Sequence, residues 1–351
     1  MRSLRTSMAG LGCLFALAAT GCSADSGDST DAAPAPPERT SASPSQSTAP
    51  TTTAPAVPAS PAYAPYVSAT EASANDPAGD PSTYNLAFVI SDGSSCTPKW
   101  NGTHSIGDSK VMSRIAALKK SGGTVRVSFG GSSGKELGAT CDSASELAQA
   151  YGAALDAAGS AQADFDIEGD ELTDPGSVDL RSRAIATLQE ERPDMEVSFT
   201  LPVMPSGLDA DSLALLESAD EHGVRVATVN IMTMNYGESY DDDMGDYAVT
   251  SATATQAQLK EVFGLSDAEA WRGMALTSMI GVQDVDNETF TLADAAEVRT
   301  FAEEKEVAWV SMWSTFRDQQ CADKATGRDD PLTNCSGVKQ GSGAFAEAFS
   351  R

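Results

Sequence analysis

The sequence predicts one α/β domain with the architecture of a (β/α)8 barrel. The chain has 351 residues, of which 41% are hydrophobic and 21% charged, and this suits one sizeable globular domain with accessory segments. Eight apolar runs of strand character follow one another between residues 63 and 351. Amphipathic helical patterns separate most of these runs. Eight strands alternating with helices match a barrel better than an open, doubly wound sheet.

The first residues are typical of an export signal. Arg2 and Arg5 provide positive charge, and the apolar stretch 11–20 is too short to span a bilayer. The sequence ATGC, ending at Cys22, resembles the lipobox of bacterial lipoproteins, in which the cysteine is acylated and becomes N-terminal. The alternative is an ordinary signal peptide cut a few residues earlier. We expect a lipoprotein-type signal peptide over 1–21, lipidation at Cys22, and an extracellular protein that is either lipid-anchored to the cell membrane or secreted.

Residues 22–62 consist mostly of Ser, Thr, Ala and Pro, with almost no large apolar side chain. Such a segment cannot bury a core, and we expect a disordered linker. In a polyproline II conformation, forty residues at ~3.1 Å each would reach about 120 Å. The segment could therefore hold a domain away from a cell wall, or be a linker of no functional consequence.

The folded domain is expected to begin near Tyr63, and its strands are read from short apolar runs. The eight runs are Ala64–Ala69, Tyr84–Ser91, Thr124–Phe129, Ala163–Ile167, Glu196–Leu201, Val226–Met234, Ala275–Ile280 and Val307–Trp313.

Helices are predicted between strands where apolar residues recur at i, i+3 and i+4 behind an Asp or Ser. Examples are SKVMSRIAALKK after Asp108, SASELAQAYGAALDAA after Asp142, and LADAAEVRTFAEEK before the last strand. The link between the first two strands, residues 70–83, differs because it contains Pro77 and Pro81 and little apolar content. We therefore expect the first helix to be reduced or missing.

Charge and cysteine content limit the functions that are possible. The formal net charge of −27 would repel nucleic acid and anionic lipid headgroups, so the substrate is expected to be neutral or cationic. Two histidines, His104 and His222, argue against a His-rich metal site, and we expect no metal and no cofactor. Of six cysteines, Cys13 and Cys22 lie in the leader region, and the other four would suffice for two disulfides in an oxidising compartment.

The chemistry is predicted from residues 163–169, ADFDIEG. Side chains alternate between the two faces of a strand, so Asp164, Asp166 and Glu168 would point into the barrel while Phe165 and Ile167 point into the helix layer. Three acids in a barrel interior are costly unless they form a site. Because the carboxyl groups are close, at least one should hold a proton near neutral pH, as a general acid must. The alternative is a solvated acidic strand edge.

This spacing resembles the D-x-x-D-x-D-x-E signature of glycoside hydrolase family 18, which includes many chitinases. The outermost Asp of the signature would fall on Ala161 and is absent. The resemblance implies that the substrate's own 2-acetamido oxygen is the nucleophile, as in substrate-assisted hydrolysis. It makes Glu168 the acid/base, Asp166 the residue that orients the acetamido group, and Asp164 the residue that tunes Asp166.

Three further motifs support the resemblance and occur in the family's order. Ser128, Gly130 and Gly131 resemble the S-x-G-G motif that ends the third strand, which implies a place beside the substrate. Trp313, in the eighth strand, resembles the tryptophan that forms the floor of the sugar subsite, although a core tryptophan is the alternative.

Residues 230–237, NIMTMNYG, resemble the M-x-Y motif of the sixth strand. We align Met234 and Tyr236 with it, so that Tyr236 would hydrogen-bond the acetamido carbonyl, but a two-residue shift is possible. Asn235 replaces the commoner acidic neighbour.

The likeness covers most of 63–351 and implies disulfides Cys96–Cys141 and Cys321–Cys335. The sequence resembles a compact, actinobacterial-type branch of the family without an insertion domain. We expect a monomer that hydrolyses β-1,4-N-acetylglucosamine linkages in chitin or its oligomers with retention. The alternatives are an endo-β-N-acetylglucosaminidase acting on N-glycans, a peptidoglycan hydrolase, or a non-catalytic chitin-binding protein.

Overall fold

A computed structural model describes residues 61–322 and 329–351. The predicted signal peptide, the lipidation site Cys22 and nearly all of the predicted linker lie outside these residues. The first described strand begins at Ala62, next to the expected start of the domain at Tyr63. Within the described residues, no helix has the length and apolar character needed to cross a bilayer.

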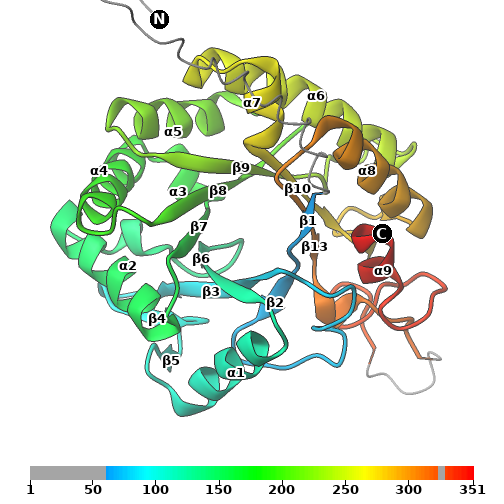
Figure 1. The fold of residues 1–351 in the computed structure, drawn as a ribbon, viewed down its shortest axis with the longest axis horizontal. Helices are drawn as coiled ribbons and strands as arrows, with labels where there is room; N and C mark the ends of the chain where they lie inside the picture. The colour runs from blue at the N-terminus through cyan, green and yellow to red at the C-terminus, as the bar shows by residue number, and fades with distance from the viewer. Residues whose placement is uncertain (1–60, 323–328) are drawn as a thin grey trace, which may run out of the picture. The chain divides into compact units, whose positions relative to one another are not determined.

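Each of the eight predicted strands is present, and neighbouring strands pair in parallel in chain order (Figure 1). They are β1 and β2 (Ala62–Tyr63 and Tyr66–Ser68), β3 (Thr83–Ser91), β6 (Thr124–Gly130), β7 (Gln162–Asp166), β8 (Glu196–Pro202), β9 (Val226–Met232), β10 (Met274–Met279) and β13 (Trp309–Trp313).

The first predicted strand joins the two ends of this order. Its first half, β1, pairs with β13, and its second half, β2, pairs with β3. Only Ala64 and Pro65 separate the halves, and the Ala64 amide donates to the Val310 carbonyl (2.9 Å) while the Asn85 amide donates to the Pro65 carbonyl (2.9 Å). The pairing therefore returns to its beginning, as the predicted (β/α)8 barrel requires.

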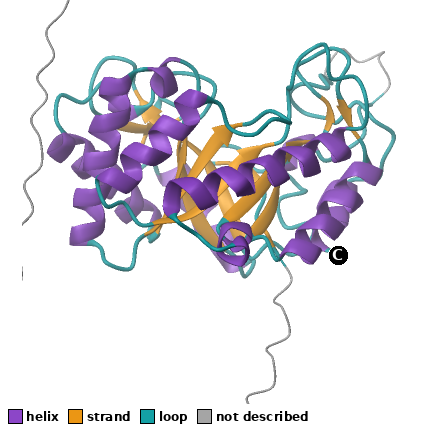
Figure 2. Ribbon diagram, turned by 90° about the horizontal axis from the view of Figure 1, so that it is seen from above, coloured by secondary structure: helices purple, strands orange, loops and turns teal. Residues whose placement is uncertain are grey.

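Helices cover the outer side of the strands (Figure 2). They are α1 (Ser109–Lys120), α2 (Ala144–Ala158), α3 (Asp170–Thr173), α4 (Pro175–Glu191), α5 (Ala210–Glu221), α6 (Met244–Phe263), α7 (Asp267–Arg272), α8 (Leu292–Lys305) and α9 (Ala344–Ser350). Asp108 caps α1 by accepting from the Lys110 amide (2.8 Å), as the sequence predicted. Residues 70–82 form turns and no helix, which confirms the expected loss of the first helix.

Two short hairpins follow barrel strands and were not predicted. In the first, β4 (Pro98–Trp100) pairs antiparallel with β3 and with β5 (His104–Ser105). The second pairs β11 (Gly281–Val282) with β12 (Thr289–Phe290). Both lie in connections at the carboxyl ends of strands, where a barrel builds its binding sites.

The two faces of β7 have opposite character. On the outer face, Phe165 stacks on Phe129 (5.3 Å between ring centroids) and lies next to the tilted ring of Phe199 (5.7 Å). Tyr151 from α2 meets Phe165 in an edge arrangement (4.9 Å). Asp164 faces the barrel interior and is fully buried. The predicted alternation of this strand is therefore confirmed.

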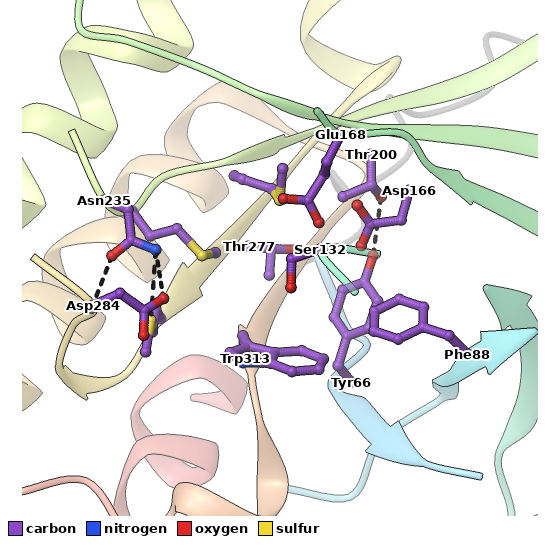
Figure 3. Close-up of a pocket in the computed structure, with 13 residues that line it drawn as sticks. Tyr66, Phe88, Ser132, Asp166, Glu168, Thr200, Asn235, Thr277, Asp284 and Trp313 are labelled. Atoms are coloured by element: carbon purple, nitrogen blue, oxygen red, sulfur yellow. Dashed lines mark hydrogen bonds between the residues drawn. The ribbon is translucent and has the colours of Figure 1, made fainter. Parts of the chain in front are cut away.

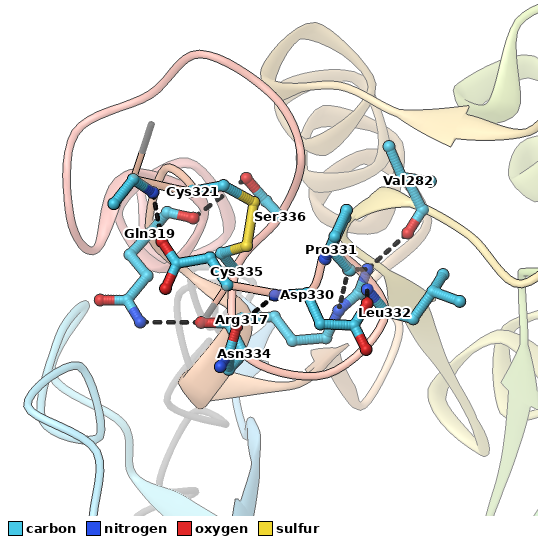
Figure 4. Close-up of a disulfide and its surroundings, with 12 residues drawn as sticks. Val282, Arg317, Gln319, Cys321, Asp330, Pro331, Leu332, Asn334, Cys335 and Ser336 are labelled. Carbon is cyan, nitrogen blue, oxygen red and sulfur yellow. Dashed lines mark hydrogen bonds between the residues drawn. A yellow bond between two sulfur atoms is a disulfide. The ribbon is translucent and has the colours of Figure 1, made fainter. Parts of the chain in front are cut away.

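Both predicted disulfides are formed, and Figure 4 shows Cys321–Cys335. Cys96–Cys141 joins the connections that follow β3 and β6. Cys321–Cys335 closes the loop after β13, where the buried Arg317 guanidinium donates to the Pro331 carbonyl (2.7 Å).

Candidate active site

A cavity opens at the carboxyl ends of the barrel strands (Figure 3). Its walls combine carboxyl groups, aromatic rings and methionines. They are Tyr66, Phe88, Ser132, Asp166, Glu168, Thr200, Met232, Met234, Asn235, Thr277, Met279, Asp284 and Trp313. We refer to this cavity as the catalytic pocket.

Below the pocket, Asp164 is the centre of a buried polar network. One carboxylate oxygen accepts hydrogen bonds from the hydroxyls of Tyr66 (2.9 Å) and Ser128 (2.6 Å). The other accepts from Ser198 (2.8 Å) and Thr200 (2.7 Å). Four donors from three strands, β2, β6 and β8, thus satisfy a fully buried acid, which explains how the barrel interior tolerates it.

Asp166 and Glu168 follow Asp164 by two and four residues along the chain, and both line the pocket. Burial, followed by the charge of Glu168, raises the pKa of Asp166 well above its ordinary value. Burial also raises the pKa of the half-buried Glu168, while a hydrogen bond with Asp166 acts in the opposite direction. The two carboxyl groups titrate as a coupled pair that retains a proton to higher pH than isolated acids do.

Ser128, Gly130 and Gly131 of the S-x-G-G motif contact Asp164 and Asp166, and none of the three lines the pocket. Ser128 binds Asp164, and the Gly131 amide donates to the Asp166 carbonyl (2.9 Å). A Cβ on Gly130 would lie 2.0 Å from that same carbonyl oxygen, and both glycines have positive φ. The motif therefore allows its strand end to lie directly against β7.

Aromatic rings form one wall of the pocket. Trp313 stacks on Phe88 (5.6 Å, 25° between planes) and meets Tyr66 edge-on (5.9 Å). Cis peptide bonds precede Phe88 and follow Trp313. A flat, half-buried indole in this position suits the apolar face of a pyranose ring, as predicted for Trp313.

The residues after β9 separate into two groups. Met234 and Asn235 line the pocket, and so does Met232. Tyr236 does not line it: its hydroxyl lies 3.4 Å from Ser251 of α6, and its ring packs against other tyrosines. The structure therefore does not support the hydrogen bond to substrate that the resemblance gave to Tyr236.

A second cavity shares Glu168, Met232, Met234 and Asn235 with the catalytic pocket. Its remaining walls are Pro202, Val203, Met204 and Asp209. Glu168 thus stands where the two cavities meet.

Sequence reasoning did not find several pocket residues, among them Tyr66, Phe88, Ser132, Thr277 and Asp284. Thr277 comes from β10, and Asp284 comes from the connection between β11 and β12. Neither belongs to a motif, and no local pattern marks them. Across the described part of the chain, no group of three or more His, Cys, Asp or Glu side chains is arranged to hold a metal ion.

A (β/α)8 barrel that presents coupled carboxyl groups beside an aromatic wall has the site of a glycoside hydrolase. No family model matches the chain. The probable bifunctional chitinase/lysozyme of Escherichia coli K12 is 35% identical over 305 residues, which are 82% of this chain and 34% of that protein. Endochitinase 11 of Metarhizium anisopliae is 32% identical over 74% of this chain and 53% of its own length. The chain thus spans about a third and a half of these two relatives.

Solved structures agree with this similarity. The catalytic domain of a hyperthermophilic chitinase from Pyrococcus furiosus superposes with a TM-score of 0.71 at 30% identity, covering 83% of this chain and 94% of that domain. A family 18 chitinase from Pseudoalteromonas aurantia, 14% identical with a TM-score of 0.53, shares the fold. The chain belongs to the chitinase-like members of glycoside hydrolase family 18, which confirms the resemblance.

Proposed function

We propose that this protein hydrolyses β-1,4-N-acetylglucosamine linkages in chitin oligomers with retention of configuration, using the substrate's acetamido group as nucleophile. The observation that carries this proposal is the coupled pair Asp166 and Glu168 in the catalytic pocket, of which Glu168 also lines the second cavity. Relatives named as chitinases support it, and a homologous domain from Pyrococcus furiosus has been crystallised with chito-oligosaccharides.

The two cavities suggest how the substrate lies. One sugar would rest on Trp313 in the catalytic pocket, and the leaving sugar would occupy the second cavity beside Met204. Glu168 would then donate its proton to the glycosidic oxygen between them. After the leaving sugar departs, the same carboxylate would take a proton from the water that completes hydrolysis.

Asp166 would orient the acetamido group. Its Oδ1 atom is buried without a hydrogen-bond partner among the described residues, although the side chain lines the pocket. A buried acceptor of this kind is costly unless a ligand satisfies it. An acetamido N–H would do so, and it would direct the acetamido oxygen towards the anomeric carbon for intramolecular attack.

The test compares Glu168→Gln with Glu171→Gln, a matched change on α3 outside both cavities. Glu168→Gln should lower kcat on chitotetraose by ~10²–10⁴ while oligosaccharide binding survives, because the proton donor alone is removed. Glu171→Gln should behave as wild type. Proton NMR of the first-formed products should show the β-anomer. Near-wild-type turnover in Glu168→Gln, or first-formed α-anomer, would contradict the proposal.

The same assays separate the alternative substrates. Cleavage of a high-mannose glycoprotein or of peptidoglycan strands, with none of chitotetraose, would favour an endo-β-N-acetylglucosaminidase or a peptidoglycan hydrolase. Binding without any turnover would indicate a carbohydrate-binding protein.

We also propose that the protein acts as an exported monomer anchored through Cys22. The disulfides Cys96–Cys141 and Cys321–Cys335 support this, because they pair every cysteine outside the leader region and are typical of an oxidising compartment. Cys22→Ala should move the protein from the membrane fraction to the medium, and an unchanged membrane fraction would contradict the anchor.

A further inference from the structure

The catalytic pocket contains a third carboxyl group, Asp284, on the connection between β11 and β12. Its side chain is exposed, unlike those of Asp166 and Glu168. Figure 3 shows it on the side of the pocket occupied by Asn235, across from Asp166.

Asn235 holds this aspartate in place through two reciprocal hydrogen bonds. The Asn235 amide group donates to Asp284 Oδ2 (3.0 Å), and the Asp284 backbone N–H donates to Asn235 Oδ1 (3.0 Å). The Asn235 backbone N–H also donates to the side chain of Gln283 (2.7 Å). Asn235 has a φ of +54°, a conformation that asparagine tolerates better than most residues.

The whole connection is anchored around this contact. Glu288, which is fully buried, accepts from the Gly237 amide (2.7 Å), and Asn287 donates to the Glu238 carbonyl (3.0 Å). On the opposite side, Arg317 donates to the Val282 carbonyl (Figure 4). Asp284 is therefore an exposed charge in a fixed position and not the end of a free loop.

We propose that Asp284, held in the pocket wall by Asn235, is a positioning residue whose negative charge faces Glu168 and extends the pH range over which Glu168 can act as the acid. This inference rests on the proposed function, because it assigns Glu168 the role of proton donor.

The charges around the two groups support this inference. Glu168 shares the catalytic pocket with Asp166, from its own chain segment, and with Asp284, and it shares the second cavity with Asp209. Of the two aspartates outside its own segment, Asp284 contributes to the raised pKa of Glu168. Arg317 interacts electrostatically with Asp284, but its guanidinium donates its hydrogen bonds to backbone carbonyls. Among the described residues, Asp284 forms no ion pair within 4 Å. Its charge is therefore left to act on the pocket.

The direct test is a ¹³C NMR titration of the glutamate side-chain carboxyl groups, with Glu168 assigned by comparison with Glu168→Gln. Asp284→Asn should lower the apparent pKa of Glu168 by about 1. This is the size expected when a unit charge across the pocket is removed and the effective dielectric constant lies between those of water and of the protein interior. Asp286→Asn, an exposed aspartate of the same connection that lines neither cavity, is the control and should leave the titration unchanged. A change below about 0.2 in Asp284→Asn, or an equal change in both variants, would overturn the inference.

Kinetics on chitotetraose provide the second measurement. The alkaline limb of the kcat/KM profile should move to lower pH in Asp284→Asn by the same amount, and 1 M salt should reduce the difference between the two proteins. A raised KM with an unmoved alkaline limb would mean that Asp284 only binds substrate, and would refute its electrostatic role. If the wild-type protein does not cleave chitin oligomers, the proposed function fails, while the NMR titration still decides whether Asp284 acts on Glu168.

Discussion

Replacing Asp164 with alanine tests whether the polar network beneath the site stabilises the barrel. The carboxylate accepts hydrogen bonds from the hydroxyls of Tyr66, Ser128, Ser198 and Thr200. In Asp164→Ala, Tyr66 could turn towards Thr200, whose hydroxyl lies 3.0 Å away, but at least two hydroxyls would stay buried without an acceptor. At about 1–3 kcal/mol for each unsatisfied group, and with some gain from removing a buried charge, the free energy of unfolding should fall by about 3 kcal/mol.

Urea denaturation followed by tryptophan fluorescence measures this loss through the transition midpoint and slope. Asp164→Asn keeps one acceptor oxygen and the side-chain volume, so it should cost about half as much. Asp156→Ala is the control, because it removes an exposed aspartate that pairs with Arg192 (2.7 Å) and should cost at most ~1 kcal/mol. If Asp164→Ala were no more destabilising than this control, the network would not hold the barrel together.

Two further predictions concern stability. The pKa of Asp166 is raised in the folded protein, so folding favours its protonated form. This stabilising contribution is present below the pKa of the unfolded chain, near 4, and is lost as the pH rises through the pKa of the folded protein. Asp166→Asn should therefore raise the melting temperature at pH 8 and change it little at pH 3.5, and an equal effect at both pH values would contradict this. Replacing Cys321 and Cys335 by serine opens a loop with a sequence separation of 14 and should cost about 3 kcal/mol under a loop-closure model. A melting temperature within 1 °C of wild type would show that the loop is held by other contacts, such as those of Arg317.

The barrel could be predicted from the sequence because each strand buries two faces. Strands such as 124–130 and 274–279 are buried over nearly their whole length, so they stand out as apolar runs between amphipathic helices. The hairpins β4–β5 and β11–β12 were missed because strands of two or three residues show no periodicity. Their positions depend on tertiary contacts that no local pattern encodes.

The acidic strand could be predicted for a similar reason. Asp164, Asp166 and Glu168 alternate with buried apolar residues, so their common direction follows from strand geometry alone. Asp284 could not be found in this way, because it is one of several acids in a polar stretch. It reaches the pocket only because the ends of β9 and β10 are neighbours in the sheet, which brings its loop against Asn235.

Tyr236 shows where an aligned motif and the structure disagree, and a conservative substitution distinguishes them. Burial raises the pKa of its hydroxyl, which faces α6, and its contact with Ser251 is long at 3.4 Å. Tyr236→Phe should therefore change kcat on chitotetraose by less than about threefold and the free energy of unfolding by less than about 1 kcal/mol. A hydroxyl that bound the acetamido carbonyl during reaction would instead be worth about 10²–10³ in kcat. A loss of that size would mean that residues 235–237 rearrange when substrate binds, which would break the contacts of Asn235 with Asp284 and of Gly237 with Glu288. Measured kcat in Tyr236→Phe thus reports whether the pocket wall stays as it is through the reaction.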